Sequence, residues 1–170
     1  MRLIIRPFAA EDETQCLAAE EAFEGSGFSF LIWHQPGMTW STYLANMAIM
    51  DEGTQLPPGK VPAANYVADV DGVLVGTISV RFALNEYLAT RGGHIGYAVH
   101  PDHRRRGYAT EMLRLGVELA RSRGVGDVLV TCDDDNVGSA AVIGRCGGEL
   151  EAVATDSDGQ RFRRYWIRPS

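Results

Sequence analysis

Residues 99–110 read VHPDHRRRGYAT, and this stretch decides the fold. A strand pattern ends at Pro101, three consecutive arginines follow, and a helix pattern opens on small residues around Gly107 and Ala109. The first N–H groups of a helix have no partner within it and lie at the positive end of its dipole, so they bind phosphate. The small residues allow a ligand close to the main chain, and the arginines add positive charge. The stretch therefore predicts a diphosphate-binding loop between a strand and a helix.

The patterns beside this stretch predict a strand, a helix and a second strand. Residues 94–100 alternate between two faces, with Ile95 and Tyr97 on the same face. Apolar residues recur at helical spacing after the loop until Gly124, and residues 128–132 form a continuous apolar run typical of a strand covered on both faces. A strand, a helix and a strand at this spacing predict a right-handed crossover between two parallel strands.

The rest of the chain predicts further strands and helices around this central unit. Asp71-Gly72 lies between two alternating segments and is typical of a β-hairpin turn. The further elements expected are a strand at 3–6, a helix at 14–23, a partly helical aromatic segment at 28–50, hairpin strands at 66–70 and 73–82, a helix near 137–146, and a terminal hairpin at 149–155 and 160–167. We therefore predict one α/β domain over residues 1–170. Its mixed sheet is antiparallel in the N-terminal strands, parallel in the central pair and flanked by helices.

Composition and charge indicate an ordinary globular protein. The 170 residues are 45% hydrophobic and carry a formal net charge of −6, which argues against a nucleic-acid-binding protein. No apolar run approaches the ~20 residues that span a bilayer. Pro7 and the acids at 11–13 interrupt the N-terminus, so we expect neither a signal peptide nor a membrane partner. Three widely spaced cysteines indicate reduced thiols in the cytoplasm and no metal site.

The pattern Arg104-x-x-Gly107-x-Ala109 between a strand and a helix resembles the GNAT superfamily of N-acetyltransferases, which bind acetyl-coenzyme A. The order of the elements extends the resemblance over nearly the whole chain, and residues 94–148 carry the recognisable motifs. The fold that the resemblance implies is the GNAT fold, with a cofactor held between two central strands that diverge.

The resemblance implies roles for the backbone of the loop and for two neighbouring segments. The loop would wrap the cofactor diphosphate, and the N–H of Val99 would polarise the thioester carbonyl, which stabilises developing oxyanion charge. Asn136 and Ser139 would contact the cofactor arm. Asn136 also opens a helix, where its ordinary role is an N-cap, and the two roles are compatible. The cofactor-binding residues implied are Val99, Arg104, Arg105, Arg106, Gly107, Tyr108, Ala109, Thr110, Asn136 and Ser139.

The chain departs from the family pattern at the proton donor. Many GNAT enzymes place a tyrosine seven positions after this asparagine, where it protonates the leaving thiolate, and this chain has Ile143 there. A general acid is typically worth ~10²–10⁴-fold, so its absence slows such an enzyme without abolishing turnover. Model thiols titrate near ~8.5, which makes the thiolate a tolerable leaving group. Water, another side chain and the substrate ammonium are the remaining candidates for the donor.

Each residue that could face the acceptor has two interpretations. His94 is the candidate catalytic base, because histidine titrates near neutral pH, and a hydrogen-bonded core histidine is the alternative. Glu86 and Tyr97 are further candidates for the base. The acids at 133–135 either attract an amine or form a solvated turn before a helix. The aromatic residues of segment 28–43 either line an acceptor pocket or pack in the core.

These observations predict a cytoplasmic acyltransferase that moves an acetyl group from acetyl-coenzyme A to a primary amine by direct attack in a ternary complex. We expect a small-molecule or peptide amine as acceptor, no metal, and, because GNAT proteins often pair through the terminal hairpin, a homodimer. One alternative is a non-catalytic coenzyme A-binding module, which Ile143 favours. The other is a nucleotide- or nucleic-acid-binding protein, which the acidic net charge disfavours.

Overall fold

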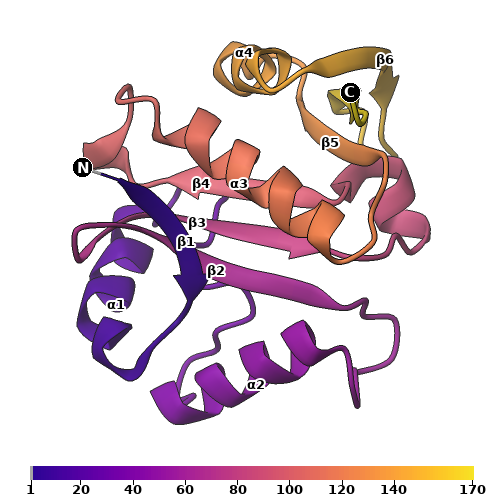
Figure 1. Cartoon of the computed structure of the whole chain (residues 1–170). Coiled ribbons are helices and arrows are strands. Elements are labelled where there is room, and N and C mark those ends of the chain that lie inside the picture. Colours follow the sequence, from indigo (N-terminus) through magenta and orange to yellow (C-terminus); the bar gives the residue numbers. More distant parts are fainter. Residues whose placement is uncertain (1) are drawn as a thin grey trace.

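The computed structural model describes residues 2–170 and divides the strands between two antiparallel sheets (Figure 1). The first sheet has the order β1-β2-β3-β4, and the second has the order β5-β7-β6. Asp71 and Gly72 have φ values of 52° and 87°, as the predicted hairpin turn between β2 and β3 requires. The strands are β1 (Leu3–Pro7), β2 (Ala63–Val70), β3 (Val73–Arg81), β4 (Ile95–Val99), β5 (Val128–Asp133), β6 (Gly148–Thr155) and β7 (Arg161–Ile167).

Helices α1 and α2 cover one face of the first sheet, and α3 covers the other face (Figure 1). The aromatic segment expected at 28–50 is helical only from Trp40, where Oγ1 of Thr39 accepts the N–H of Thr42 and caps the helix. Within residues 2–170, no helix is long and apolar enough to cross a membrane. The helices are α1 (Glu13–Ala22), α2 (Trp40–Glu52), α3 (Tyr108–Ser122) and α4 (Val137–Arg145), with single turns at Ala10–Asp12, Leu88–Gly92 and Pro101–His103.

Alternation along the strands assigns each side chain to one of two cores. Val67 of β2 and Ala98 of β4 pack with residues of α1 and α2, whereas Ile78 of β3 and Ile95 of β4 pack with residues of α3. Helix α3 approaches the sheet closely at Gly116, because a Cβ added there would lie 2.7 Å from Cδ1 of Ile78. The first sheet thus separates the α3 face from the face that carries α1 and α2.

The predicted parallel central pair does not form a ladder, because every strand pairing in residues 2–170 is antiparallel. Strands β4 and β5 meet where the N–H of His94 donates to the carbonyl O of Leu129 at 2.7 Å. The N–H of Leu129 donates in turn to Nδ1 of His94 at 2.9 Å. The imidazole therefore takes the place of the main-chain acceptor that would continue the ladder. Beyond this junction β4 pairs only with β3, and its other edge has no strand partner.

Gly93 shapes the junction between the two sheets. Its φ of 68° and ψ of −174° belong to a region that is essentially restricted to glycine. A Cβ added at this position would lie 2.7 Å from the carbonyl O of Leu129. The N–H of Gly93 donates to the carbonyl O of Leu88 at 2.7 Å and closes a single π turn that the sequence analysis does not predict. Both the backbone angles and the close approach to β5 therefore require glycine here.

Candidate active site

The end of the loop between β4 and α3 and the first two residues of α3 present five main-chain N–H groups without partners in the described residues. Arg105 and Gly107 have φ values of 64° and 83°, and these two left-handed residues turn the chain immediately before α3. No hydrogen bond within residues 2–170 uses the N–H groups of Arg105, Arg106, Gly107, Tyr108 or Ala109. Adjacent N–H groups in such turns and at a helix N-terminus bind anions. The loop thus contains the donors that the predicted diphosphate site requires.

The arginine side chains of this loop contact the loop itself. Nε of Arg104 donates to the carbonyl O of Val99 at 3.2 Å, and the guanidinium of Arg106 donates to the carbonyl O of Asp102 at 3.3 Å. Arg105 is exposed. Two of the three arginines therefore fix the shape of the loop, in addition to the positive charge that the sequence analysis assigns to them.

The first main-chain hydrogen bond of α3 joins the N–H of Thr110 to the carbonyl O of Gly107 at 3.1 Å. A hollow of about 290 Å³ lies beside this helix start. Its lining residues are Arg2, Leu3, Arg106, Gly107, Tyr108 and Glu111. Three of the five residues with unpartnered N–H groups, Arg106, Gly107 and Tyr108, therefore line a hollow between the start of α3 and the start of β1.

The N–H of Val99 points to the unpaired edge of β4. The N–H of His100 donates to the carbonyl O of Val75 on β3 at 2.9 Å, and the carbonyl O of His94 accepts from Arg81 on β3 at 2.7 Å. Successive residues of a strand direct their N–H groups to opposite edges, so the N–H of Val99 faces away from β3. The donor that the resemblance assigns to the thioester carbonyl is therefore on a free strand edge.

The start of α4 is joined to β4 by a side-chain contact. Oδ1 of Asn136 accepts the N–H of Ser139 at 3.0 Å, so the N-cap interpretation of Asn136 is confirmed. The hydroxyl of Ser139 lies 2.9 Å from the hydroxyl of Tyr97 on β4. Burial raises the pKa of Tyr97 to about 12, although the hydrogen bond with Ser139 lowers it. Ile143 is fully buried and has no hydroxyl, and the phenol that contacts Ser139 comes from β4.

His94 lies at the junction of the two sheets and is 7% exposed. Burial lowers the pKa of His94 below 6.5, and the positive charge of Arg81 lowers it further. Because Nδ1 accepts the N–H of Leu129, the ring is neutral and carries its proton on Nε2. This geometry matches the alternative of a hydrogen-bonded core histidine. The role of His94 as general base stays a prediction, and it requires the bond to Leu129 to break when Nδ1 takes a proton.

We expect the stability of the protein to fall as the pH drops below about 6.5, because His94 binds a proton more weakly in the folded than in the unfolded chain. In that range the unfolded chain takes up a proton that the folded chain excludes, so acid favours unfolding. Melting temperatures from about pH 8 to about pH 5 check this in the wild type and in His94→Asn, whose amide oxygen can accept the N–H of Leu129. Equal losses in the two proteins would contradict the prediction.

The comparison with known families decides the classification. The sequence model of the acetyltransferase (GNAT) family matches residues 29–147, which is most of the chain. The chain belongs to the GNAT acetyltransferase family. Among curated protein sequences, none matches it.

Solved structures have the GNAT fold of this chain at low sequence identity. RimJ of Mycobacterium smegmatis in complex with CoA-disulfide is 17% identical, with a TM-score of 0.70 over 97% of this chain and 81% of that chain. RimL, a ribosomal L7/L12 α-N-protein acetyltransferase in complex with coenzyme A, is 17% identical, with a TM-score of 0.66 over 98% and 94%. The yncA protein of Salmonella typhimurium with its cofactor acetyl-CoA is 16% identical, with a TM-score of 0.64 over 98% and 93%. These likenesses confirm the predicted mixed α/β GNAT fold but not its parallel central pair.

Two of the acids at 133–135 in this GNAT protein are held in ion pairs. A carboxylate oxygen of Asp133 lies 2.6 Å from the guanidinium of Arg91, and one of Asp134 lies 2.8 Å from Nε of Arg163. These pairs tie the end of β5 to β7 and to the turn before β4, so both carboxylates already have a cationic partner in the fold. Within residues 2–170, no group of three or more His, Cys, Asp or Glu side chains could hold a metal ion.

Core packing accounts for most of the aromatic residues of segment 28–43. Phe30, Trp40 and Tyr43 are buried among residues of these helices. Phe28 and Trp33 are exposed, and Trp33 has a left-handed φ of 62°. The acceptor-pocket interpretation is therefore open only for Phe28 and Trp33.

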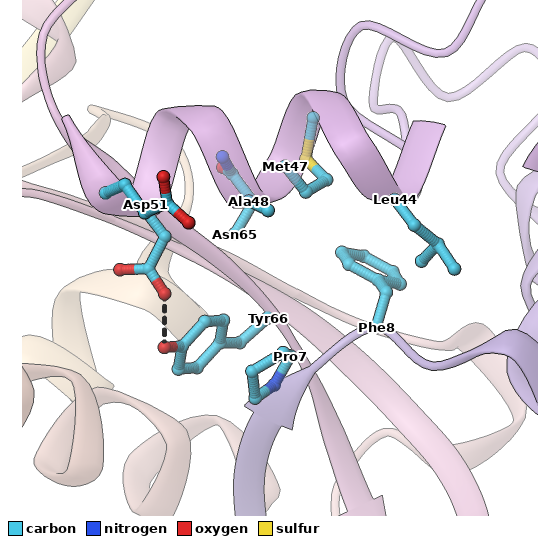
Figure 2. Close-up of a pocket in the computed structure, with 9 residues that line it drawn as sticks. Pro7, Phe8, Leu44, Met47, Ala48, Asp51, Asn65 and Tyr66 are labelled. Atoms are coloured by element: carbon cyan, nitrogen blue, oxygen red, sulfur yellow. Dashed lines mark hydrogen bonds between the residues drawn. The ribbon is translucent and has the colours of Figure 1, made fainter. Parts of the chain in front are cut away.

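A second hollow, of about 200 Å³, lies between α2 and the end of β1 (Figure 2). At one end the hydroxyl of Tyr66 donates to Asp51 at 2.7 Å. None of the predicted site residues lines this hollow, so it is separate from the candidate active site. Its lining residues are Pro7, Phe8, Leu44, Met47, Ala48, Asp51, Glu52, Asn65 and Tyr66.

Sequence reasoning missed one charged residue of the site. Arg81 ends β3 and lowers the pKa of His94, and the sequence analysis does not single it out. The available signal was an arginine that directly follows an otherwise uncharged strand run at 73–80. Its partners depend on how β3 pairs with β4, which no local pattern specifies.

Proposed function

We propose that this protein transfers an acetyl group from acetyl-coenzyme A to a primary amine, which attacks the thioester directly in a ternary complex. The observation that carries the proposal is the set of five unpartnered N–H groups at the start of α3, because such a set binds a diphosphate. The solved relatives that hold coenzyme A or acetyl-CoA support the same cofactor. The acceptor is a small-molecule or peptide amine, and the likeness to RimL, an α-N-protein acetyltransferase, supports the peptide class.

In the proposed complex, main-chain groups hold the cofactor. The diphosphate accepts hydrogen bonds from the N–H groups of residues 105–109, and the cofactor arm lies along the free edge of β4 with Asn136 and Ser139 beside it. The N–H of Val99 donates to the thioester carbonyl, where negative charge grows during the attack. The amine nitrogen forms a bond to the carbonyl carbon and gives up a proton to the general base, for which His94 is the candidate. The C–S bond breaks, and the electron pair leaves with sulfur.

The proposed donor to the departing thiolate is the hydroxyl of Tyr97. Ile143 has no polar hydrogen, and the bond between Tyr97 and Ser139 brings a phenol from β4 to the start of α4 instead. With a pKa of about 12 this phenol stays protonated at neutral pH and can donate a hydrogen bond. A thiol titrates near ~8.5, so a hydrogen bond without full proton transfer is sufficient for departure.

Binding and thiol release together test the proposed function. Acetyl-coenzyme A is expected to raise the melting temperature, whereas ATP and duplex DNA are not, because only the first fills both the loop and the β4 edge. Free thiol is then measured with a panel of small amines and N-terminal peptides. No stabilisation by acetyl-coenzyme A would reject the proposal. Stabilisation without thiol release from any amine would support the non-catalytic coenzyme A-binding module, which Ile143 favours.

The same proposal includes a cytoplasmic, single-domain enzyme that forms a homodimer. Three free cysteines support a reducing compartment. Leu150 and Val153 are exposed on β6, an edge strand of the second sheet, and such apolar side chains favour pairing through the terminal hairpin. A molar mass measured in solution distinguishes the dimer from a monomer.

If His94 is the general base, His94→Asn is expected to lower kcat by ~10²–10⁴-fold and to remove the acidic limb of the pH–rate profile. The amide of asparagine can still accept the N–H of Leu129, but it cannot take a proton from an amine. His94→Ala is the companion variant, since it loses both functions. If His94→Asn had wild-type turnover and an unchanged pH–rate profile, His94 would take no part in the chemical step. Its role would then be structural, through the hydrogen bond that joins β4 to β5.

A further inference from the structure

Arg81 holds its guanidinium over Gly96 without an acidic partner. A Cβ added at Gly96 would lie 3.4 Å from Nη2 and 3.5 Å from Nη1 of Arg81. Nη1 donates to the carbonyl O atoms of Gly92 and Gly93 at 3.2 and 3.4 Å. No carboxylate in residues 2–170 is paired with this guanidinium. Nε and Nη2 therefore have free donors.

The position of this charge is costly unless an anion accompanies it. Burial lowers the pKa of Arg81, because the guanidinium is held largely out of water. A cation withdrawn from water is unfavourable without a paired negative group. Only Nη1 of Arg81 donates to the turn at Gly92 and Gly93. The other two guanidinium nitrogens, Nε and Nη2, can therefore donate to a carboxylate or phosphate.

The sheet beside Arg81 carries a row of polar and small residues on the same face. Asn65 of β2, Ser79 of β3 and Gly96 of β4 lie opposite one another in register. Asn65 is 3% exposed and Ser79 is 8% exposed, and the polar atoms of both side chains have no hydrogen-bond partner in the described residues. Asn65 is visible under α2 in Figure 2. Unpartnered buried polar groups are rare in a core, so this row of residues differs from the apolar residues around it.

A second cation lies at the same end of the sheet. Lys60 precedes β2, and its Nζ lies 4.4 Å from the ring centroid of the exposed Trp33. The side chain of Asn85, in the turn after β3, donates to the carbonyl O of Gly59 at 3.0 Å, so this segment and that turn are tied together. Two cations at one end of a sheet attract a negatively charged ligand.

We infer that Arg81 binds a carboxylate or phosphate group of the amine acceptor. The inference rests on the proposed function and narrows the acceptor from any primary amine to one that carries a negative group. The absence of a side chain at Gly96 lets the guanidinium lie over β4, next to the junction at His94 where the two sheets part. The guanidinium would bind the acid bidentately through Nε and Nη2 while Nη1 keeps its contacts to the turn.

Matched pairs of amines test the charge requirement by binding, without turnover. The protein is saturated with coenzyme A, and its melting temperature is followed with γ-aminobutyrate against γ-aminobutyramide and with O-phosphoethanolamine against ethanolamine. We expect an anionic member to stabilise the complex more than its neutral partner, and the pair that shows the difference identifies carboxylate or phosphate. Equal shifts within both pairs, or none, would overturn the inference.

Variants assign the effect to Arg81. Arg81→Gln is expected to weaken binding of the anionic amine by about 10- to 100-fold and to leave the neutral amine unaffected, since a charged hydrogen-bonded contact is lost. Arg91→Gln is the matched control, because Arg91 is nearby in sequence but already paired with Asp133 and Asp156. Gly96→Ala provides a second route if Arg81→Gln does not fold, as its Cβ occupies the space beside the guanidinium. Unchanged discrimination in Gly96→Ala and Arg81→Gln would contradict the inference.

Failure of this inference can be told apart from failure of the proposed function. Stabilisation by acetyl-coenzyme A and thiol release with neutral amines would uphold the acetyl transfer and reject the role of Arg81. Discrimination between anionic and neutral amines without any thiol release would support the Arg81 site and reject the transfer. The stabilisation that acetyl-coenzyme A gives to Arg81→Gln serves as the check that the loop at α3 is intact.

Discussion

Gly107→Glu is expected to abolish binding of acetyl-coenzyme A, with affinity lowered by at least about 100-fold. Gly107 lies in the middle of the five unpartnered N–H groups, and its φ of 83° directs the chain into α3. A glutamate here would place a negative charge at the proposed diphosphate site, where like charges cost several kcal/mol. The stabilisation of the protein by acetyl-coenzyme A, measured as a shift in melting temperature over a range of concentrations, gives the affinity of each variant.

Gly107→Gln separates charge from shape in this experiment. Glutamine has nearly the same size as glutamate and suffers the same strain in a left-handed backbone, roughly 1–3 kcal/mol. A Cβ at this position meets no atom within 4 Å, so neither variant is expected to clash. Glutamine should therefore retain part of the binding that glutamate loses. Wild-type affinity in Gly107→Glu would mean that the diphosphate binds elsewhere.

Gly93→Ala is expected to destabilise the fold by roughly 2–4 kcal/mol, a large fraction of the total stability of a domain. Its φ of 68° with ψ of −174° is accessible almost only to glycine, and the new Cβ would lie 2.7 Å from the carbonyl O of Leu129. Main-chain atoms of β5 cannot move aside as a flexible side chain would. Urea unfolding of the variant and the wild type measures the difference.

Gly126→Ala is the matched control for Gly93→Ala. Gly126 precedes the same strand β5, but its φ is outside the left-handed range and an added Cβ meets nothing within 4 Å. Its stability is therefore expected to stay within about 0.5 kcal/mol of the wild type. If both alanine variants were equally stable, the close approach of Gly93 to β5 would not be a constraint on the fold.

The local sequence was sufficient to predict the strand and the helix on either side of the loop at 100–107. Pro101 marks the end of the strand, and Gly107 marks the start of the helix. The spacing of apolar residues after Gly107 specifies the buried face of α3. The hairpin at Asp71-Gly72 is likewise encoded in two residues that adopt left-handed angles. These features depend on neighbours in the sequence, and all of them were predicted.

The pairing between distant strands could not be predicted in the same way. An apolar run such as 128–132 indicates a buried strand, but not which strand lies beside it, so β5 was expected next to β4 in a parallel ladder. The expected ladder does not form, because the side chain of His94 accepts the N–H of Leu129 in place of a main-chain carbonyl. Arg81 was missed for the same reason, since its position over Gly96 depends on the register between β3 and β4.

The N–H groups at the start of α3 belong to the peptide unit, which is the same in every residue type except proline. A binding surface made of them tolerates changes of side chain provided that the backbone angles at Arg105 and Gly107 persist. Proline would be excluded from positions 105–109, where each amide hydrogen is free to donate. The binding surface at this loop therefore depends on the backbone dihedral angles at Arg105 and Gly107 more than on the chemistry of the side chains around them.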